Sequence, residues 1–278
     1  GLLAPGQTLP IDATPQHLFV WRGLPEPLVP LGADDPSDRS RLVEALNRFA
    51  ARSEADDFSA ITSFLKENPQ SPWRMAVTAN LGLFQYRQGY FSLCIESYKT
   101  AWELGRDAQE PKAKALADLA GGEYAKMLSR LGRMDDIRAF LEEVKDHAFQ
   151  GPATERVSAA RQGLFFMEKR PEISFRCGPL ALASILISQG KLDLAARTSE
   201  LESTVEGTSL AQVSDLAKKL GLAYQPARRA PGAAMLYPSI VHWKVGHYAA
   251  LLGEEAGRHH SKDPTFENDT WLTTRCLD

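Results

Sequence analysis

Residues 175–186 are Phe-Arg-Cys-Gly-Pro-Leu-Ala-Leu-Ala-Ser-Ile-Leu, a cysteine followed directly by small and aliphatic side chains. The apolar run continues to Ile187 and stops at Gln189-Gly190. A continuous apolar run bounded by glycine is typical of a buried helix with a glycine at its C-terminal end. The sequence therefore predicts a helix that carries Cys177 in its first turn.

The position of Cys177 at a helix start has two interpretations. The helix dipole and the free backbone N–H groups of a first turn stabilise a thiolate, which is the form of cysteine that attacks carbonyl carbons. Free cysteine is also among the most buried residue types in proteins. Without partners elsewhere in the chain, an inert core cysteine is the simpler interpretation of Cys177.

Two candidate partners follow in the C-terminal part of the chain. Residues 236–252, Leu-Tyr-Pro-Ser-Ile-Val-His-Trp-Lys-Val-Gly-His-Tyr-Ala-Ala-Leu-Leu, predict two short strands joined at Lys244-Val245-Gly246. His247 then begins a strand, and Asp263 follows 16 residues later, after a turn expected near Gly253 and a short polar strand. Cysteine, histidine and aspartate in this order form the set needed for acyl transfer by a thiol, in which histidine activates cysteine and aspartate orients the imidazole.

Further short motifs accompany these three residues. In chain order they are Cys177-Gly178-Pro179-Leu180-Ala181, Gly207-Thr208-Ser209-Leu210 leading into residues 213–222, Tyr237-Pro238-Ser239-Ile240-Val241-His242-Trp243, Gly246-His247-Tyr248 and Asp263-Pro264. Together they resemble the C39 family of bacteriocin-processing, papain-like cysteine peptidases. The resemblance covers residues 171–278 and implies a catalytic set with Cys177 as nucleophile, His247 as base and Asp263 as orienting carboxylate. His242 matches no catalytic position and is expected to be a strand residue.

The chain departs from this family pattern at two positions. Members usually carry a glutamine six residues before the nucleophile, whose amide helps to form the oxyanion hole, whereas this chain has Pro171 there. Loss of one such donor typically lowers the rate by about 10²–10³. The residue directly before the cysteine, commonly aspartate, is Arg176, a cation that would favour the thiolate. The departures leave open whether the domain cuts peptides or only binds them.

Composition excludes several classes of function. The chain has 278 residues, 44% of them hydrophobic, and 32 basic against 35 acidic side chains give a net charge of −3. This mixed charge indicates neither a nucleic-acid partner nor an anionic membrane surface. Three cysteines without CxxC spacing indicate neither a disulfide scaffold nor a zinc site, and His259-His260 lacks a third ligand at a recognisable spacing. We expect no cofactor, no metal and no membrane span.

The N-terminal part predicts a different architecture. Residues 1–38 carry seven prolines, so we expect an extended or irregular arm, partly ordered by the packing of Phe19, Val20 and Trp21. Residues 39–150 show helical periodicity and resemble tetratricopeptide repeats, in which a glycine lets two helices cross closely. The residues that carry this resemblance are Leu81-Gly82, Gly89, Phe91, Cys94, Tyr98 and Ala101, with a degenerate second copy at Leu131, Gly132, Met134, Ile137, Leu141 and Val144. A connecting helix at 151–170 would lead into the C39-like domain at 171–278.

One pair of residues could suggest self-cleavage. The C39 family cuts after double glycine, and Gly121-Gly122 occurs in this chain. Because the pair lies inside a predicted helix, where a peptidase cannot bind an extended substrate, we interpret it as a close helix crossing.

The sequence therefore predicts an α+β protein with N-terminal helical repeats and a papain-like peptidase domain that contains a small antiparallel sheet. The expected function is a cysteine peptidase that cuts after a double-glycine-type site, either in trans on a leader peptide or in cis on a larger bacterial parent chain. The alternatives are a catalytically inactive domain that binds a peptide or export signal, with the repeats as scaffold, and a structural spacer domain. The expected partners are a peptide or protein substrate and the rest of the parent chain, and the sequence favours neither a cytoplasmic nor an exported location.

Overall fold

The computed structural model describes residues 8–266 and 268–278 of the chain, which divide into two compact units. The first unit comprises Gly1–Lys126 and Val144–Ser158, and the second comprises Met127–Glu143 and Ala159–Asp278. Helices α6 (Pro111–Arg130) and α8 (Pro152–Lys169) each belong partly to one unit and partly to the other.

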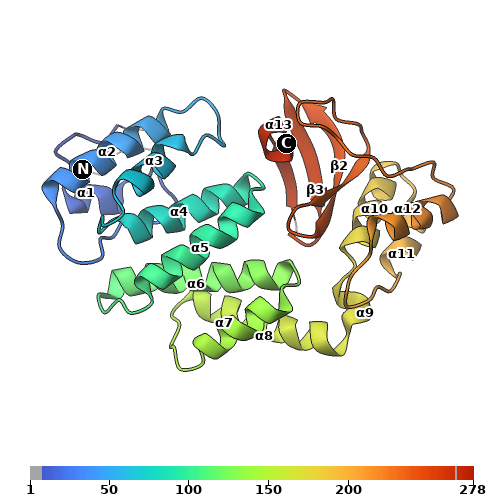
Figure 1. Cartoon of the computed structure of the whole chain (residues 1–278), viewed down its shortest axis with the longest axis horizontal. Helices are drawn as coiled ribbons and strands as arrows, with labels where there is room; N and C mark the ends of the chain where they lie inside the picture. Colours follow the sequence, from blue (N-terminus) through green and yellow to red (C-terminus); the bar gives the residue numbers. More distant parts are fainter. Residues whose placement is uncertain (1–7, 267) are drawn as a thin grey trace. The chain divides into compact units, whose positions relative to one another are not determined.

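The first unit is helical (Figure 1). Besides the N-terminal parts of α6 and α8, it contains α1 (Pro15–Val20), α2 (Pro36–Ala50), α3 (Ser59–Glu67), α4 (Arg74–Arg87) and α5 (Phe91–Gly105). Helices α4 and α5 pack against each other, and a side chain at Gly82 would stand 3.0 Å from the ring of Tyr98. Gly82 therefore permits the close approach of these two helices.

The described part of the proline-rich N-terminal stretch, residues 8–38, includes a short helix that was not predicted. It contains α1, which begins with Pro15, and the Thr14 side chain accepts the backbone N–H of His17. Proline is favoured at the first helical position because its missing N–H would have no acceptor there. Leu9, Leu18 and Trp21 are buried, so this stretch contributes to the core of the first unit.

The double glycine lies inside α6, as predicted, and marks a close approach between helices. A side chain at Gly122 would stand 2.9 Å from the Cα atom of Ala153 in α8, and one at Gly121 would stand 2.7 Å from the ring of Trp102 in α5. Backbone in this position has neither the extended conformation nor the exposure that a peptidase substrate needs.

The second unit joins helices to one four-stranded antiparallel sheet with the strand order β1-β2-β3-β4. Its helices, besides the C-terminal parts of α6 and α8, are α7 (Met134–Glu143), α9 (Pro171–Ser174), α10 (Cys177–Ser188), α11 (Leu192–Ser199), α12 (Leu210–Lys219) and α13 (Thr274–Leu277). Its strands are β1 (Ser239–Trp243), β2 (His247–Glu255), β3 (Arg258–Asp263) and β4 (Asn268–Leu272). Helices followed by an antiparallel sheet confirm the α+β class.

Helix α10 forms the centre of this unit. It packs against α11, α12 and the sheet, and these elements lie together in Figure 1. Leu182, Ala183 and Leu186 of α10 are buried in one cluster with Ala195 of α11 and Ala217 of α12. The apolar run that follows Cys177 is therefore buried on several sides, which fixes the position of the cysteine at its start. Among the described residues, no helix combines the length and apolar character needed to cross a membrane.

Candidate active site

Cys177 is the first residue of α10, as the sequence predicted. It is half-buried, and the residue after it is held tightly: a side chain at Gly178 would stand 2.8 Å from Val213 Cγ2 and 3.3 Å from Thr208 Cβ. The first N–H groups of a helix have no acceptor within the helix, so the start of α10 presents backbone donors next to the thiol.

His247 is the first residue of β2 and follows the predicted turn, in which the Gly246 N–H donates to the Trp243 carbonyl at 2.9 Å. Gly246 has φ +78°, a conformation that glycine adopts without strain. The side chain of His247 is 4% exposed, and its interaction with the Cys177 thiol is one of the causes that raise the pKa of the imidazole. The imidazole therefore reaches the thiol from the sheet.

Asp263 is the last residue of β3, and its Oδ2 lies 2.8 Å from His247 Nε2. Its other oxygen, Oδ1, accepts the Thr265 N–H at 3.0 Å. Because Nε2 interacts with Asp263, Nδ1 is the ring nitrogen that remains for Cys177. The structure thus brings together all three residues that the sequence singled out, in the order thiol, imidazole, carboxylate.

A β-bulge places Asp263 on the correct face of the sheet. Strands β2 and β3 pair Leu251 with Ser261 but Gly253 with His260, so one extra residue is present in β2 between these pairs. A shift of one residue moves every side chain beyond it to the opposite face. On the side of the bulge that is away from the β2–β3 turn, Ala250 pairs with Lys262. In this register the side chain of Asp263 lies on the same face of the sheet as that of His247. The turn expected near Gly253 is wrong: Gly253 lies within β2 beside the bulge, and the turn follows at residues 256–257. Glycine within a strand is a recognised sign of a bulge.

The electrostatics of the site favour an ion pair. Burial acts to raise the pKa of Cys177, but the hydrogen bond and the charge of His247, together with the backbone N–H groups of Tyr248 and Gly178, lower it overall. Burial acts to lower the pKa of His247, but the hydrogen bonds to Asp263 and Cys177 and their charges raise it to about 9. A thiol with a lowered pKa beside an imidazole with a raised pKa favours the thiolate–imidazolium pair over the neutral pair.

Phe266 is a further residue of this site that the sequence analysis did not identify. Its ring meets the His247 ring edge to face at a centroid distance of 5.5 Å, and its N–H donates to the Asp263 carbonyl at 3.2 Å. The guanidinium of Arg130 lies 5.8 Å from the centre of the Phe266 ring. An apolar ring in this position limits the access of water to the imidazole and so strengthens its ion pair with Asp263.

The two departures from the family pattern have clear structural positions. Pro171 begins α9 and offers no amide donor. Arg176 donates from Nε to the Ile173 carbonyl at 3.0 Å and from NH1 to the Ser199 carbonyl at 2.6 Å, so its guanidinium holds the chain before α10. The expectation that Arg176 favours the thiolate is not supported, because the groups that lower the Cys177 pKa are His247 and two backbone N–H groups.

The other histidines of the sheet lie outside this set. His242 is a strand residue, as expected, and stacks on Tyr248 at a centroid distance of 4.3 Å. His259 contacts the hydroxyls of Tyr237 and Thr274, and His260 Nε2 lies 2.8 Å from Asp269. Within residues 8–266 and 268–278, no group of three or more His, Cys, Asp or Glu side chains is arranged to hold a metal ion.

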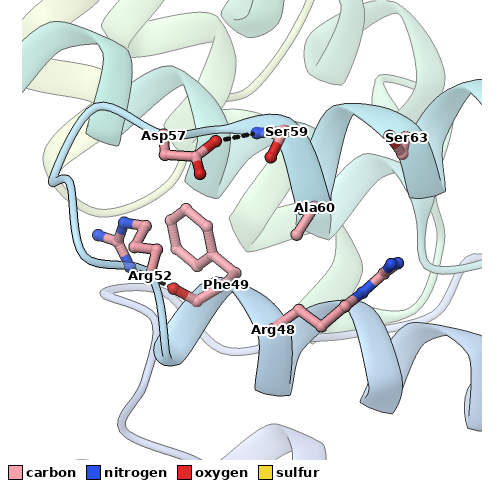
Figure 2. Close-up of a pocket in the computed structure, with 7 residues that line it drawn as sticks. All are labelled: Arg48, Phe49, Arg52, Asp57, Ser59, Ala60 and Ser63. Atoms are coloured by element: carbon pink, nitrogen blue, oxygen red, sulfur yellow. Dashed lines mark hydrogen bonds between the residues drawn. The ribbon is translucent and has the colours of Figure 1, made fainter.

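A surface pocket of about 240 Å³ is present in the first unit (Figure 2). The Arg52 guanidinium lies 3.7 Å from the centre of the Phe49 ring and donates to the Phe49 carbonyl at 2.7 Å, while Asp57 accepts the Ser59 N–H at 3.0 Å. The full lining is Arg48, Phe49, Arg52, Asp57, Ser59, Ala60 and Ser63. Arg52 is thus bonded to the last turn of α2 and Asp57 to the first residue of α3. The pocket contains none of the three residues of the candidate active site.

Comparison with known proteins assigns no family: no family model, no curated protein and no solved structure matches the chain. Function is therefore inferred from the geometry around Cys177.

Proposed function

We propose that this protein is a cysteine peptidase of the C39 type, with a papain-like domain in its C-terminal part. One observation carries the proposal: buried His247 lies 2.8 Å from buried Asp263 and interacts with Cys177, so that the imidazole pKa is raised and the thiol pKa is lowered. A shifted pKa at a thiol and at its neighbouring base is characteristic of nucleophilic sites.

The proposed mechanism proceeds in two stages. The Cys177 thiolate attacks the carbonyl carbon of a peptide bond, and the N–H groups at the start of α10 stabilise the negative charge on the carbonyl oxygen. The imidazolium of His247 gives its proton to the leaving amine, the C–N bond breaks and a thioester forms. A water molecule gives a proton to His247 and attacks the thioester, which releases the carboxylic acid and restores the thiolate–imidazolium pair. Asp263 orients the imidazole throughout.

The resemblance to the C39 family gives the expected substrate, a peptide cut after two glycines. The helices of the first unit are proposed to be tetratricopeptide-like and to hold the peptide or the parent chain. The close α4–α5 approach at Gly82 and Tyr98 supports this assignment, because a glycine opposite an aromatic ring is typical of these repeats.

The test uses peptides that contain a double glycine, with matched peptides in which alanine replaces both glycines. Cleavage and a transient acyl adduct on Cys177, seen as a mass increase of the intact protein, are expected for the wild type and not for Cys177→Ala. The absence of both products with every peptide would refute the peptidase assignment.

The second candidate function is peptide binding without cleavage, and the proline in place of an oxyanion donor at residue 171 favours it. Under this alternative, double-glycine peptides bind equally to the wild type and to Cys177→Ala, and no adduct forms.

A further inference from the structure

We infer that the turn between α6 and α7 is a positioning element of the Cys177 site. The inference rests on the proposed function. It assigns a role to Gly132 in this turn and to Arg130, the last residue of α6 before the turn, which lie more than 40 residues before the cysteine in the chain. This turn belongs to the same compact unit as α10 and the sheet.

On the thiol side, the turn contacts the segment that leads into α10. Gly132 has φ +68°, and a side chain there would stand 2.7 Å from Cε1 of the Phe175 ring. Phe175 follows α9 and lies two residues before Cys177. The ring therefore packs on bare backbone at Gly132, and its position determines where the chain enters α10.

On the imidazole side, the same turn reaches the cover of His247. The Arg130 guanidinium lies 5.8 Å from the centre of the Phe266 ring, within the range of a cation–π contact. Phe266 in turn packs edge to face on His247. One turn thus contacts both the segment before the thiol and the ring that covers the imidazole.

Small displacements of the thiol or the imidazole are expected to change the reactivity of the site. Reacting groups must be held within about 0.5 Å of their productive geometry by residues that are themselves held in place. A shift of the Phe175 segment moves Cys177 relative to His247, and a weaker hydrogen bond between them removes the main cause of the low thiol pKa. The turn acts through Phe175 and Phe266 and does not touch the reacting atoms.

The test compares Gly132→Ala with Gly190→Ala. Both glycines have positive φ, +68° and +72°, so both variants carry the same kind of backbone strain, but nothing lies within 4 Å of a side chain at Gly190. The rate of alkylation of Cys177 is measured against pH in a Cys276→Ser background, because Cys94 is fully buried and Cys276 is not. Gly132→Ala is expected to raise the apparent thiol pKa by about one unit, which slows alkylation at pH 6 about tenfold. Gly190→Ala is expected to match the unsubstituted background.

A second pair of variants leaves the backbone unstrained. Arg130→Met removes the cation above Phe266, while Arg133→Met removes a cation of the same turn that pairs with Asp136 at 3.7 Å. Arg130→Met is expected to slow alkylation at pH 6 several-fold relative to Arg133→Met, and this comparison decides the question if Gly132→Ala does not fold.

The outcomes distinguish a failure of this inference from a failure of the proposed function. The inference is overturned, and the proposed function left standing, if the thiol pKa is low and equal in Gly132→Ala and Gly190→Ala. If Gly132→Ala does not fold, an equally low thiol pKa in Arg130→Met and Arg133→Met has the same meaning. An ordinary thiol pKa in the unsubstituted background would overturn both.

Discussion

Replacement of Asp263 by asparagine tests how far one carboxylate controls the site. The side chains of His247 and Asp263 are 4% and 7% exposed, so solvent screens their interaction little. A hydrogen bond between charged groups contributes about 1.5–3 kcal/mol, and one pKa unit corresponds to about 1.4 kcal/mol. The pKa of His247, raised to about 9, should therefore fall by about one to two units in Asp263→Asn.

The assay is a titration of ¹³C-labelled histidine by NMR, with the His247 signal assigned by its loss in His247→Gln. Asp263→Asn keeps an oxygen that can orient the imidazole, whereas Asp263→Leu removes both the charge and the hydrogen bond, so the second variant should lower the pKa further. Asp269→Asn is the matched control, because Asp269 makes a 2.8 Å contact to His260 on the same sheet but is half exposed. An unchanged His247 titration in Asp263→Asn and Asp263→Leu would refute the reasoning.

Three further predictions concern packing and pH. Gly178→Ala should lower the free energy of unfolding by about 1–3 kcal/mol in urea titrations, because its side chain would stand 2.8 Å from Val213, and a neutral effect would contradict this contact. Gly122→Ala should also lower the free energy of unfolding by about 1–3 kcal/mol, since its side chain would stand 2.9 Å from the Ala153 backbone. A gain in stability of about 1 kcal/mol, as helix propensity alone gives, would show that α6 and α8 do not cross closely there. In Cys177→Ala the hydrogen bond and charge of Asp263 still act to raise the pKa of His247, and the stability that a raised imidazole pKa contributes is fully present below the ordinary value of 6.5 and is lost as pH rises through the folded pKa. In the wild type the lowered pKa of the thiol opposes this trend, because the folded state has released a proton that the unfolded state still holds. Urea unfolding at several pH values should therefore show a steeper decline of the free energy of unfolding with rising pH in the variant than in the wild type. Parallel declines would contradict the coupling between the two groups.

Local patterns predicted the elements of the site well. The apolar run after Cys177 gave a helix that begins at that residue, and the turn at Lys244-Val245-Gly246 gave the two strands that place His247 at a strand start. These predictions succeed because hydrophobic periodicity and turn residues act over a few positions of the chain.

Features that depend on contacts between distant segments were missed. The extra residue in β2 decides the face of Asp263, yet its only local sign is Gly253. The packing of Phe266 on His247 and of Phe175 on Gly132 has no local sign, because each contact joins segments that are apart in the chain. The packing of Tyr248, which is 3% exposed, against α10 and α12 is a contact between distant segments of the same kind.

The most direct test of the account is the titration of Cys177 itself. The ultraviolet absorbance of its thiolate is followed against pH in the wild type and in His247→Ala, with Cys177→Ser as the baseline. The account predicts that thiolate forms in the wild type well below the ordinary thiol pKa of about 8.5 and that His247→Ala shifts its formation upward. Titration near about 8.5 in both proteins would show that His247 does not activate Cys177, and would contradict the assignment of an active site.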